Sequence, residues 1–146
     1  MTQSSGARSR ARDLLVQALY QMQITGHDRE ELQKQFRERR DYENVDREYF
    51  DESLAEILRN LAALEQSVAD LADRPLVQLD PVEHGILLLG IHELESRTEI
   101  PYRVVINEAV NLARRFGAVD GHKYVNAVLD RAALRIRPTE NRGNSG

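Results

Sequence analysis

The sequence predicts an all-α protein of about seven helices, arranged as an N-terminal three-helix bundle and a C-terminal helical bundle. Three observations support this fold class. Apolar residues recur at three- and four-residue spacings, as they do on one face of a helix. Glycine and proline fall mostly at the boundaries between these stretches. The alternation of β-branched and polar residues that is typical of strands is absent.

The N-terminal part predicts three helices. The first covers about residues 7–24, where one apolar stripe repeats at helical spacing before a Thr-Gly pair. The second begins at Asp28, whose carboxylate can accept hydrogen bonds from the first turn while Glu31 reaches back, as in a capping box. The third follows Asp46 and either runs on, or breaks and restarts, towards Leu76.

The strongest helix start lies at Asp80, which is followed by proline and by Glu83 in the pattern of a capping box. Residues 86–91 behind it are apolar almost all round, which predicts a central helix contacted on several sides. A buried strand is the alternative for such a run, but the capping pattern favours a helix. Gly85 and Gly90 each cost about 1 kcal/mol there, which predicts a close approach of neighbouring helices.

Two more helices complete the predicted fold. One follows Pro101 and ends at Gly117, which is expected to adopt the left-handed conformation of a helix C-terminus. The other begins at Asp120, which is expected to cap it, and ends before Pro138.

The length of 146 residues fits one domain with a core, expected over residues 7–138. The weakly apolar stretch 73–75 is expected to separate subdomains of about 7–74 and 75–138. The remaining segments, 1–6 and 139–146, are expected to be disordered.

The composition excludes several classes of protein. With 41% apolar and 30% charged residues the chain is globular rather than disordered. It has no apolar run near the roughly 18–20 residues of a membrane span, and no apolar segment of a secretory signal near its N-terminus. It has no cysteine, hence no disulfide framework and no cysteine-based site. These features together indicate a cytoplasmic protein.

Charge is segregated along the chain. The net charge of −4 argues against a nucleic-acid ligand. However, residues 8–12 hold three arginines and no acid, and residues 131–146 hold four arginines against one glutamate. Residues 38–56 hold eight acids against three arginines. A basic face can therefore coexist with an acidic total, although each cluster taken alone can equally be a solvated surface.

The sequence holds no pattern of catalysis, metal binding or cofactor binding. Its four histidines are scattered and no HExxH motif occurs. His84 and His92 lie near the same helical face, but no carboxylate stands at four-residue spacing to complete a metal site. A glycine-rich phosphate loop and a nucleophile elbow are also missing. We therefore expect no enzyme activity, no metal and no cofactor.

Two polar clusters at helix starts suit RNA instead. In the first, Arg8 and Arg12 share a helical face and Arg10 lies on another. An arginine guanidinium binds phosphate with two parallel hydrogen bonds and stacks on bases. The alternative is a solvated leading turn.

The second cluster lies at the start of the last helix, at Asp120, His122, Lys123 and Tyr124. A cation there is unfavourable to the helix dipole, unless an anion binds beside the free N–H groups. Tyr124 can stack on a base, as aromatic residues do when they bind single-stranded RNA, or it can pack at the edge of the apolar stripe that includes Val125.

From about residue 7 to residue 138, the chain resembles the NusB family. The resemblance is carried by segments spread along the whole chain. They are Ala11-Arg12, Val16-Gln17-Ala18-Leu19-Tyr20, Val45-Asp46, Tyr49-Phe50, Pro101-Tyr102, Ile106-Asn107-Glu108-Ala109, Leu112-Ala113, Phe116-Gly117-Ala118, His122-Lys123, Val125-Asn126 and Val128-Leu129-Asp130.

The resemblance implies an all-α fold of two small bundles packed as one NusB-like unit. It implies binding of single-stranded boxA RNA in nascent ribosomal transcripts, and a heterodimer with NusE, a small-subunit ribosomal protein. The pair would join RNA polymerase with other Nus factors and suppress premature, Rho-dependent termination. The alternative is a protein-interaction module that holds NusE, or forms a homodimer, with only weak RNA contact.

By position, the resemblance assigns two groups of residues. The RNA-binding positions are Arg8, Arg10, Arg12, Asp120, His122, Lys123 and Tyr124. The positions at or near the NusE contact are Tyr20 and Glu83. Gly121 stands where serine is more usual in the family.

Overall fold

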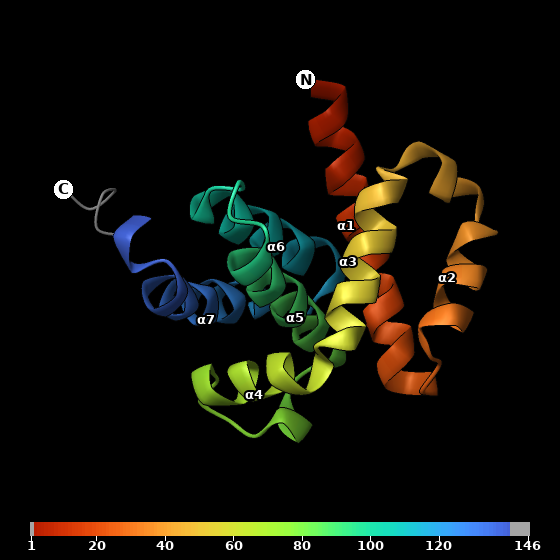
Figure 1. Ribbon diagram of the computed structural model, residues 1–146. Coiled ribbons are helices and arrows are strands. Elements are labelled where there is room, and N and C mark those ends of the chain that lie inside the picture. Colours follow the sequence, from red (N-terminus) through yellow and green to blue (C-terminus); the bar gives the residue numbers. More distant parts are fainter. Residues whose placement is uncertain (1, 141–146) are drawn as a thin grey trace. The chain divides into compact units, whose positions relative to one another are not determined.

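The structure is a computed structural model that describes residues 2–140, with side chains from residue 6 onwards. Over that range it consists of helices and connecting turns and contains no strand, which confirms the predicted fold class. The elements, labelled in Figure 1, are α1 (Thr2–Thr25), α2 (Arg29–Arg37), the 3-10 helix η1 (Arg40–Asn44), α3 (Arg47–Arg59), α4 (Leu61–Leu71), the 3-10 helix η2 (Leu76–Gln78), α5 (Pro81–Ser96), α6 (Tyr102–Phe116) and α7 (Gly121–Ile136).

The chain divides into two compact units between Leu61 and Ala62, rather than near residue 74 as the sequence suggested. The difference arises because α4 makes its polar contacts with the second unit. The carbonyl of Leu71 accepts a hydrogen bond of 2.8 Å from Arg131 of α7, and Glu65 pairs with His84 of α5.

In the first unit α1 packs against α3, and α2 and η1 complete the bundle. The expected caps are present: the carboxylate of Asp28 accepts a hydrogen bond from the Glu31 N–H at 3.0 Å, and that of Asp46 accepts one from the Tyr49 N–H at 3.1 Å. Phe50 is fully buried and forms the aromatic centre of the unit, with ring centroids 5.8 Å from Phe36 and 5.9 Å from Tyr42.

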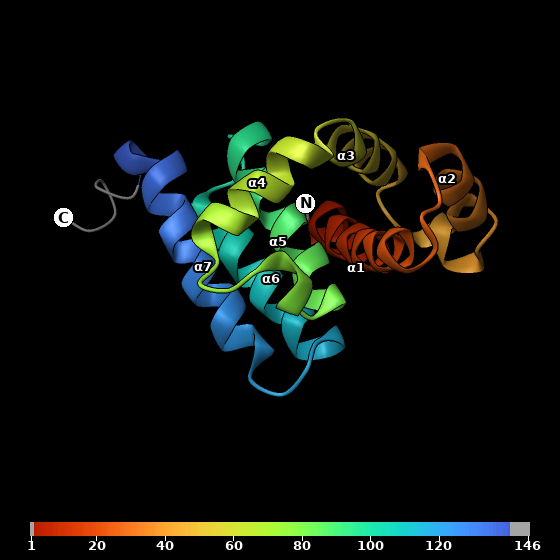
Figure 2. The same cartoon turned by 90° about the horizontal axis from the view of Figure 1, so that it is seen from below.

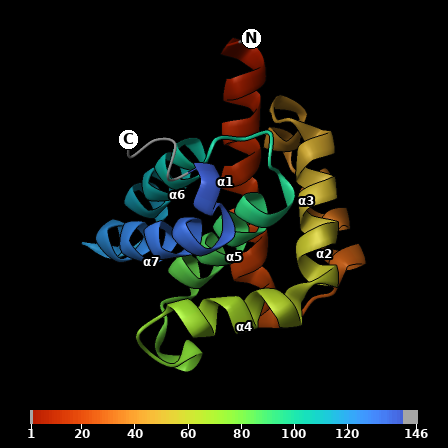
Figure 3. The ribbon, with the colours of Figure 1, turned by 60° about the vertical axis from the view of Figure 1, so that its left-hand side comes forward.

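Both ends of the described range continue further than expected. Helix α1 begins at Thr2 rather than near Ala7, and its amino-terminal end extends beyond the neighbouring α3 (Figures 1 and 3). At the other end, Glu140 forms an ion pair with Arg137 at 3.0 Å, so the ordered chain continues past residue 138. The rest of the expected tail, residues 141–146, lies outside the described residues, as does Met1.

In the second unit α5 is the central helix, as predicted. Its twelve residues from Glu83 to Leu94 are all buried, and α6 and α7 both pack against it (Figures 2 and 3). Gly90 permits this packing, because a β-carbon there would lie only 2.9 Å from Leu129 of α7. The predicted close approach of a neighbouring helix is therefore present at Gly90.

Candidate nucleic-acid interface

The turn that joins α6 to α7, seen at the lower edge of Figure 2, holds one of the two polar clusters. Two sequence expectations about its backbone are wrong. Gly117 is extended, with φ −91° and ψ 178°, and the left-handed residue is Asp120, with φ 68°. Asp120 also makes no side-chain hydrogen bond to the start of α7. Asparagine and aspartate tolerate this backbone conformation best among residues with a side chain, so Asp120 serves the turn through its backbone.

A buried carboxylate supports the backbone of the turn. Glu83, in the first turn of α5, is only 7% exposed and accepts a hydrogen bond from the backbone N–H of Ala118. A β-carbon at Gly121 would overlap this carboxylate, so only glycine fits there while Glu83 keeps its place. Burial, and then the charge of Asp80, raises the pKa of Glu83, whereas the Ala118 N–H opposes the rise.

The expectation that Glu83 completes the capping box at Asp80 is therefore wrong. Its carboxylate contacts a segment that is distant in the sequence. Asp80 does cap α5, since its carboxylate accepts from the N–H groups of Val82 at 2.8 Å and Glu83 at 3.3 Å. The Glu83 side chain turns to the 118–121 segment instead. Glu83 is buried, so it supports the backbone of the turn rather than lying on its exposed surface.

Lys123 is the most exposed cation of this cluster. Its side chain is 72% exposed and its ammonium lies 3.4 Å from the carboxylate of Asp120, which is 67% exposed. This ion pair accounts for a cation in the first turn of α7 without any ligand. An ion pair so exposed is weak, however, and a phosphate can replace it at little cost. His122 beside it is half-buried.

Tyr124 has one ring face covered. The guanidinium of Arg74 lies 4.2 Å from the ring centroid, and Tyr124 is half-buried. Burial raises the pKa of its phenol, against the opposing charge of Arg74. A base can stack on this ring only on the remaining face or in place of Arg74. Local spacing could not predict the role of Arg74, because its contact with Tyr124 joins segments fifty positions apart.

The three arginines of α1 have three different environments. Arg8 lies 3.5 Å from the Asp46 carboxylate and 4.4 Å from the Tyr49 ring centroid. Arg12 is 4% exposed, and its guanidinium is 5.5 Å from the same ring. Arg10 is exposed and donates a hydrogen bond of 2.8 Å to the Asn44 carbonyl. Burial favours a packing role for Arg12, and leaves Arg10 as the arginine best placed to meet a phosphate.

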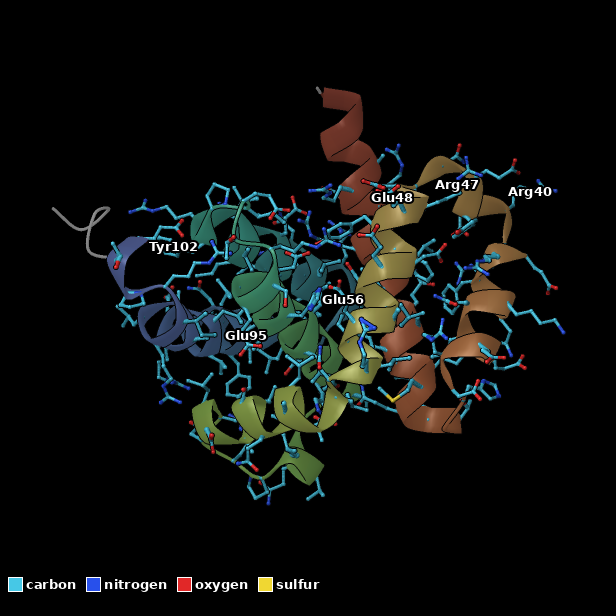
Figure 4. All side chains as sticks on the ribbon, in the orientation of Figure 1. Arg40, Arg47, Glu48, Glu56, Glu95 and Tyr102 are labelled. Carbon is cyan, nitrogen blue, oxygen red and sulfur yellow. The ribbon has the colours of Figure 1, made fainter. Side chains whose placement is uncertain are left out.

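The acidic stretch 38–56 balances part of this basic charge inside the first unit. Besides the pair of Arg8 and Asp46, Arg37 lies 3.2 Å from Asp51, and Arg39 lies 2.8 Å from Asp41. Figure 4 labels Arg40, Arg47 and Glu48, which project from the outer side of η1 and α3. The charge clusters that stand apart in the sequence are therefore partly paired in the fold.

Tyr20, assigned by resemblance to a partner contact, lies on the surface of α1. It is 43% exposed, and Ile24, one turn further along, is 61% exposed. Two large apolar side chains thus share one exposed face of α1, a common feature of protein-binding surfaces. Ile24 was not singled out from the sequence, although its four-residue spacing from Tyr20 was visible there.

Two features are absent from the described part of the chain. No group of three or more histidine, aspartate or glutamate side chains there is arranged to hold a metal ion. No helix among the described residues has the length and apolar character needed to cross a membrane.

Comparison with known proteins gives consistent matches. A family model described as the NusB family matches residues 9–134. The transcription antitermination protein NusB of Halorhodospira halophila is 50% identical over 135 residues, which cover 91% of this chain and 86% of that protein. The protein of the same name from Paraburkholderia phymatum is 45% identical and covers 92% of both chains. A solved structure of T. maritima NusB superposes with a TM-score of 0.73 at 26% identity, over 92% of this chain and 96% of that one.

Proposed function

The chain belongs to the NusB family of transcription antitermination proteins, and on that premise we propose that it binds boxA RNA of nascent ribosomal transcripts together with NusE. In this proposal the complex joins RNA polymerase with other Nus factors and suppresses Rho-dependent termination. The protein acts as a binding factor in the cytoplasm and performs no reaction of its own.

The observation that best supports the proposal is the structure of the α6–α7 turn. A buried glutamate, Glu83, fixes the backbone of residues 118–121 and keeps Gly121 free of a side chain. Lys123 and Asp120 stand exposed above this support, and His122 is partly exposed beside them. A fixed backbone with an exposed cation at a helix N-terminus suits a phosphate of a single strand.

The arginines of α1 form the second part of the proposed RNA contact. Arg10 is exposed and Arg8 is partly exposed, so both can meet phosphates, while Arg12 packs beside Tyr49, the ring that Arg8 also contacts. We propose that RNA contacts both clusters. A substitution in either cluster should then weaken RNA binding by the full chain.

NusE is proposed to bind the exposed face of α1 that carries Tyr20 and Ile24. Glu83, which is buried, is not included in this proposed surface. Tyr20→Ala should then weaken NusE binding without changing RNA binding by the isolated chain.

A second function from another class uses the same apolar face. The exposed Tyr20 and Ile24 also suit a homodimer, in which the chain would act as an interaction module with weak RNA contact. Mass measured in solution, with and without boxA RNA, separates the two. A dimer that RNA dissociates would support a homodimer that covers RNA-binding residues, whereas a dimer that persists with RNA bound would show that the homodimer leaves them free.

The decisive experiment measures binding of boxA RNA, with and without NusE, at two salt concentrations. A boxA RNA with scrambled sequence is the control. We expect tighter binding of boxA RNA than of the control, a further gain with NusE, and weaker binding at higher salt because phosphate contacts release counterions. Equal binding of the two RNAs in the presence of NusE would contradict the proposal.

A further inference from the structure

A polar groove runs between α6 and α7, beside the turn that joins them. Its volume is about 580 Å³, within the range of sites that hold small organic groups. Its lining side chains come from one stripe of each helix. They are Asn107, Val110, Asn111 and Arg114 of α6, and His122, Lys123 and Asn126 of α7.

The charge of the groove differs from that of the chain as a whole. The chain carries 24 acidic and 20 basic residues, yet no lining residue of the groove is acidic and two of them, Arg114 and Lys123, are cations. Apart from Val110 the other lining residues are three asparagines and a histidine. Such a surface attracts an anion and offers hydrogen bonds in both directions, since an amide both donates and accepts.

The asparagines of the groove have no partner within the described residues. No hydrogen bond or ion pair there involves the side chain of Asn107, Asn111 or Asn126, nor that of Arg114. Glutamines on the other helices behave differently. Gln17 donates to the Asp13 carbonyl at 3.2 Å and Gln66 donates to the Asp70 carboxylate at 2.9 Å. The amides of the groove are thus available to a ligand.

We propose that this groove binds a short stretch of single-stranded RNA adjacent to the segment at the α6–α7 turn, with Asn107, Asn111 and Asn126 reading base edges and Arg114 holding a phosphate. The inference rests on the proposed function, because Lys123 and His122 belong both to the groove and to the turn. Single-stranded RNA fits because its unstacked bases expose the edges that amides can hydrogen-bond.

The charge is tested by a matched pair of arginines. Arg114 and Arg135 are both exposed and both lie in the last turn of their helices, α6 and α7, but only Arg114 lines the groove. Arg114→Gln and Arg135→Gln remove the same charge from the full chain. With boxA RNA carrying its natural flanks, we expect Arg114→Gln to weaken binding about three- to tenfold and to reduce the salt slope by about one, with Arg135→Gln near the unsubstituted chain. Equal effects of the two would overturn the proposal.

The base contact is tested by Asn111→Ala. Alanine favours a helix more than asparagine does, so α6 is not weakened by the change. We expect a loss of affinity of about two- to tenfold, as for one hydrogen bond. The effect of Asn111→Ala on affinity is then measured with a set of RNAs, each of which carries an abasic position at a different base. At the contacted base the effect of Asn111→Ala should disappear, because the group it binds is already missing.

The outcomes separate the two proposals. If the unsubstituted chain binds boxA RNA specifically, but Arg114→Gln and Asn111→Ala bind it equally well, the groove is not an RNA site and the proposed function survives. If each variant weakens binding but no abasic position removes the effect of Asn111→Ala, base reading is overturned. If the unsubstituted chain shows no specific RNA binding with or without NusE, the proposed function and this inference fail together.

Discussion

The carboxylate of Glu83 occupies the space that a side chain at Gly121 would need. Glu83 lies in the first turn of α5 and Gly121 begins α7, so this contact fixes the start of one helix against the start of another. The same carboxylate accepts a hydrogen bond from the Ala118 N–H. A single buried side chain thereby shapes the turn that exposes Lys123.

Gly121→Ala should displace Glu83 from this position. The alanine β-carbon and the carboxylate cannot share the space, and the flexible glutamate is the group that moves, with loss of its bond to Ala118. We expect a cost of about 0.5–2 kcal/mol in the free energy of unfolding, measured by urea denaturation. Gly6→Ala is the matched control, since a β-carbon there meets only Arg10 at 3.4 Å.

A double-mutant cycle tests the cause. In a Glu83→Ala background the Gly121→Ala substitution no longer meets a carboxylate and should cost less than it does alone. Additive free-energy changes would mean that the two residues act independently and that the contact does not shape the turn.

The raised pKa of Glu83 predicts a pH dependence of stability. Because burial, and then the charge of Asp80, favours the protonated form in the fold, the native protein loses stability as pH rises from the ordinary value of 4.5 through the raised folded pKa. Glu83→Gln cannot ionise and should lack this loss. Urea titrations at several pH values should show the two proteins similar below pH 4.5 and the glutamine variant relatively more stable above the window. A constant difference over the whole range would show that Glu83 is not the group responsible.

The local signals in the sequence predicted most helix starts correctly. Asp28, Asp46 and Asp80 each accept hydrogen bonds from the first turn of the expected helix. A cap needs only a side chain and the N–H groups two or three residues later, so its evidence lies in a few adjacent positions. The apolar run at 86–91 was equally informative, because a helix that is apolar all round has to be central.

The α6–α7 turn was predicted poorly because its shape depends on a distant residue. Aspartate is a favoured residue at a helix N-terminus. The backbone of Asp120 is left-handed, however, and its side chain makes no capping hydrogen bond to α7. The support comes from Glu83, far back in the chain, which local spacing assigned to a capping box at Asp80. The placement of α4 in the second unit has the same origin, since Arg131 and His84 are its polar partners.

Arg137 is predicted to be the largest single contributor to the stability of the second unit among its polar side chains. It is 7% exposed and donates to the carbonyls of Leu94 at 3.0 Å, Glu93 at 3.1 Å and Arg97 at 2.9 Å, at the end of α5. Arg137→Met would remove these three hydrogen bonds, although the Glu93 and Arg97 carbonyls also accept from the backbone N–H groups of Arg97 and Ile100. We expect a loss of about 2–5 kcal/mol in the free energy of unfolding. The exposed Arg135→Met should stay within about 0.5 kcal/mol, and a similar loss for both would contradict this role.

Glu140 adds an acid-sensitive contact beside Arg137. Its carboxylate accepts a hydrogen bond of 2.8 Å from the N–H of Tyr102, labelled in Figure 4, and pairs with Arg137. The Tyr102 N–H, and then Arg137, lowers the pKa of Glu140. A depressed carboxyl pKa stabilises the fold above pH 4.5, and this contribution is lost as pH falls through the folded pKa. The Glu140→Gln variant should therefore differ from the unsubstituted chain at neutral pH and converge with it in acid, as measured by thermal unfolding. An equal difference at both pH values would exclude titration of Glu140 as the cause.

Arg10 and Arg12 are both arginines of one cluster, and their spacing shows only that they lie on different faces of α1. It does not show how far each side chain is buried. In the fold Arg10 is exposed, while Arg12 is buried beside Tyr49. Arg10→Ala should therefore weaken boxA RNA binding and reduce its salt slope by about one, with little change in stability. Arg12→Ala should lower the free energy of unfolding by about 1–3 kcal/mol, since it removes buried contacts. Measuring affinity and urea stability on both variants decides the matter. If Arg12→Ala keeps full stability and loses RNA affinity, Arg12 meets the RNA directly and its burial beside Tyr49 does not persist in the complex.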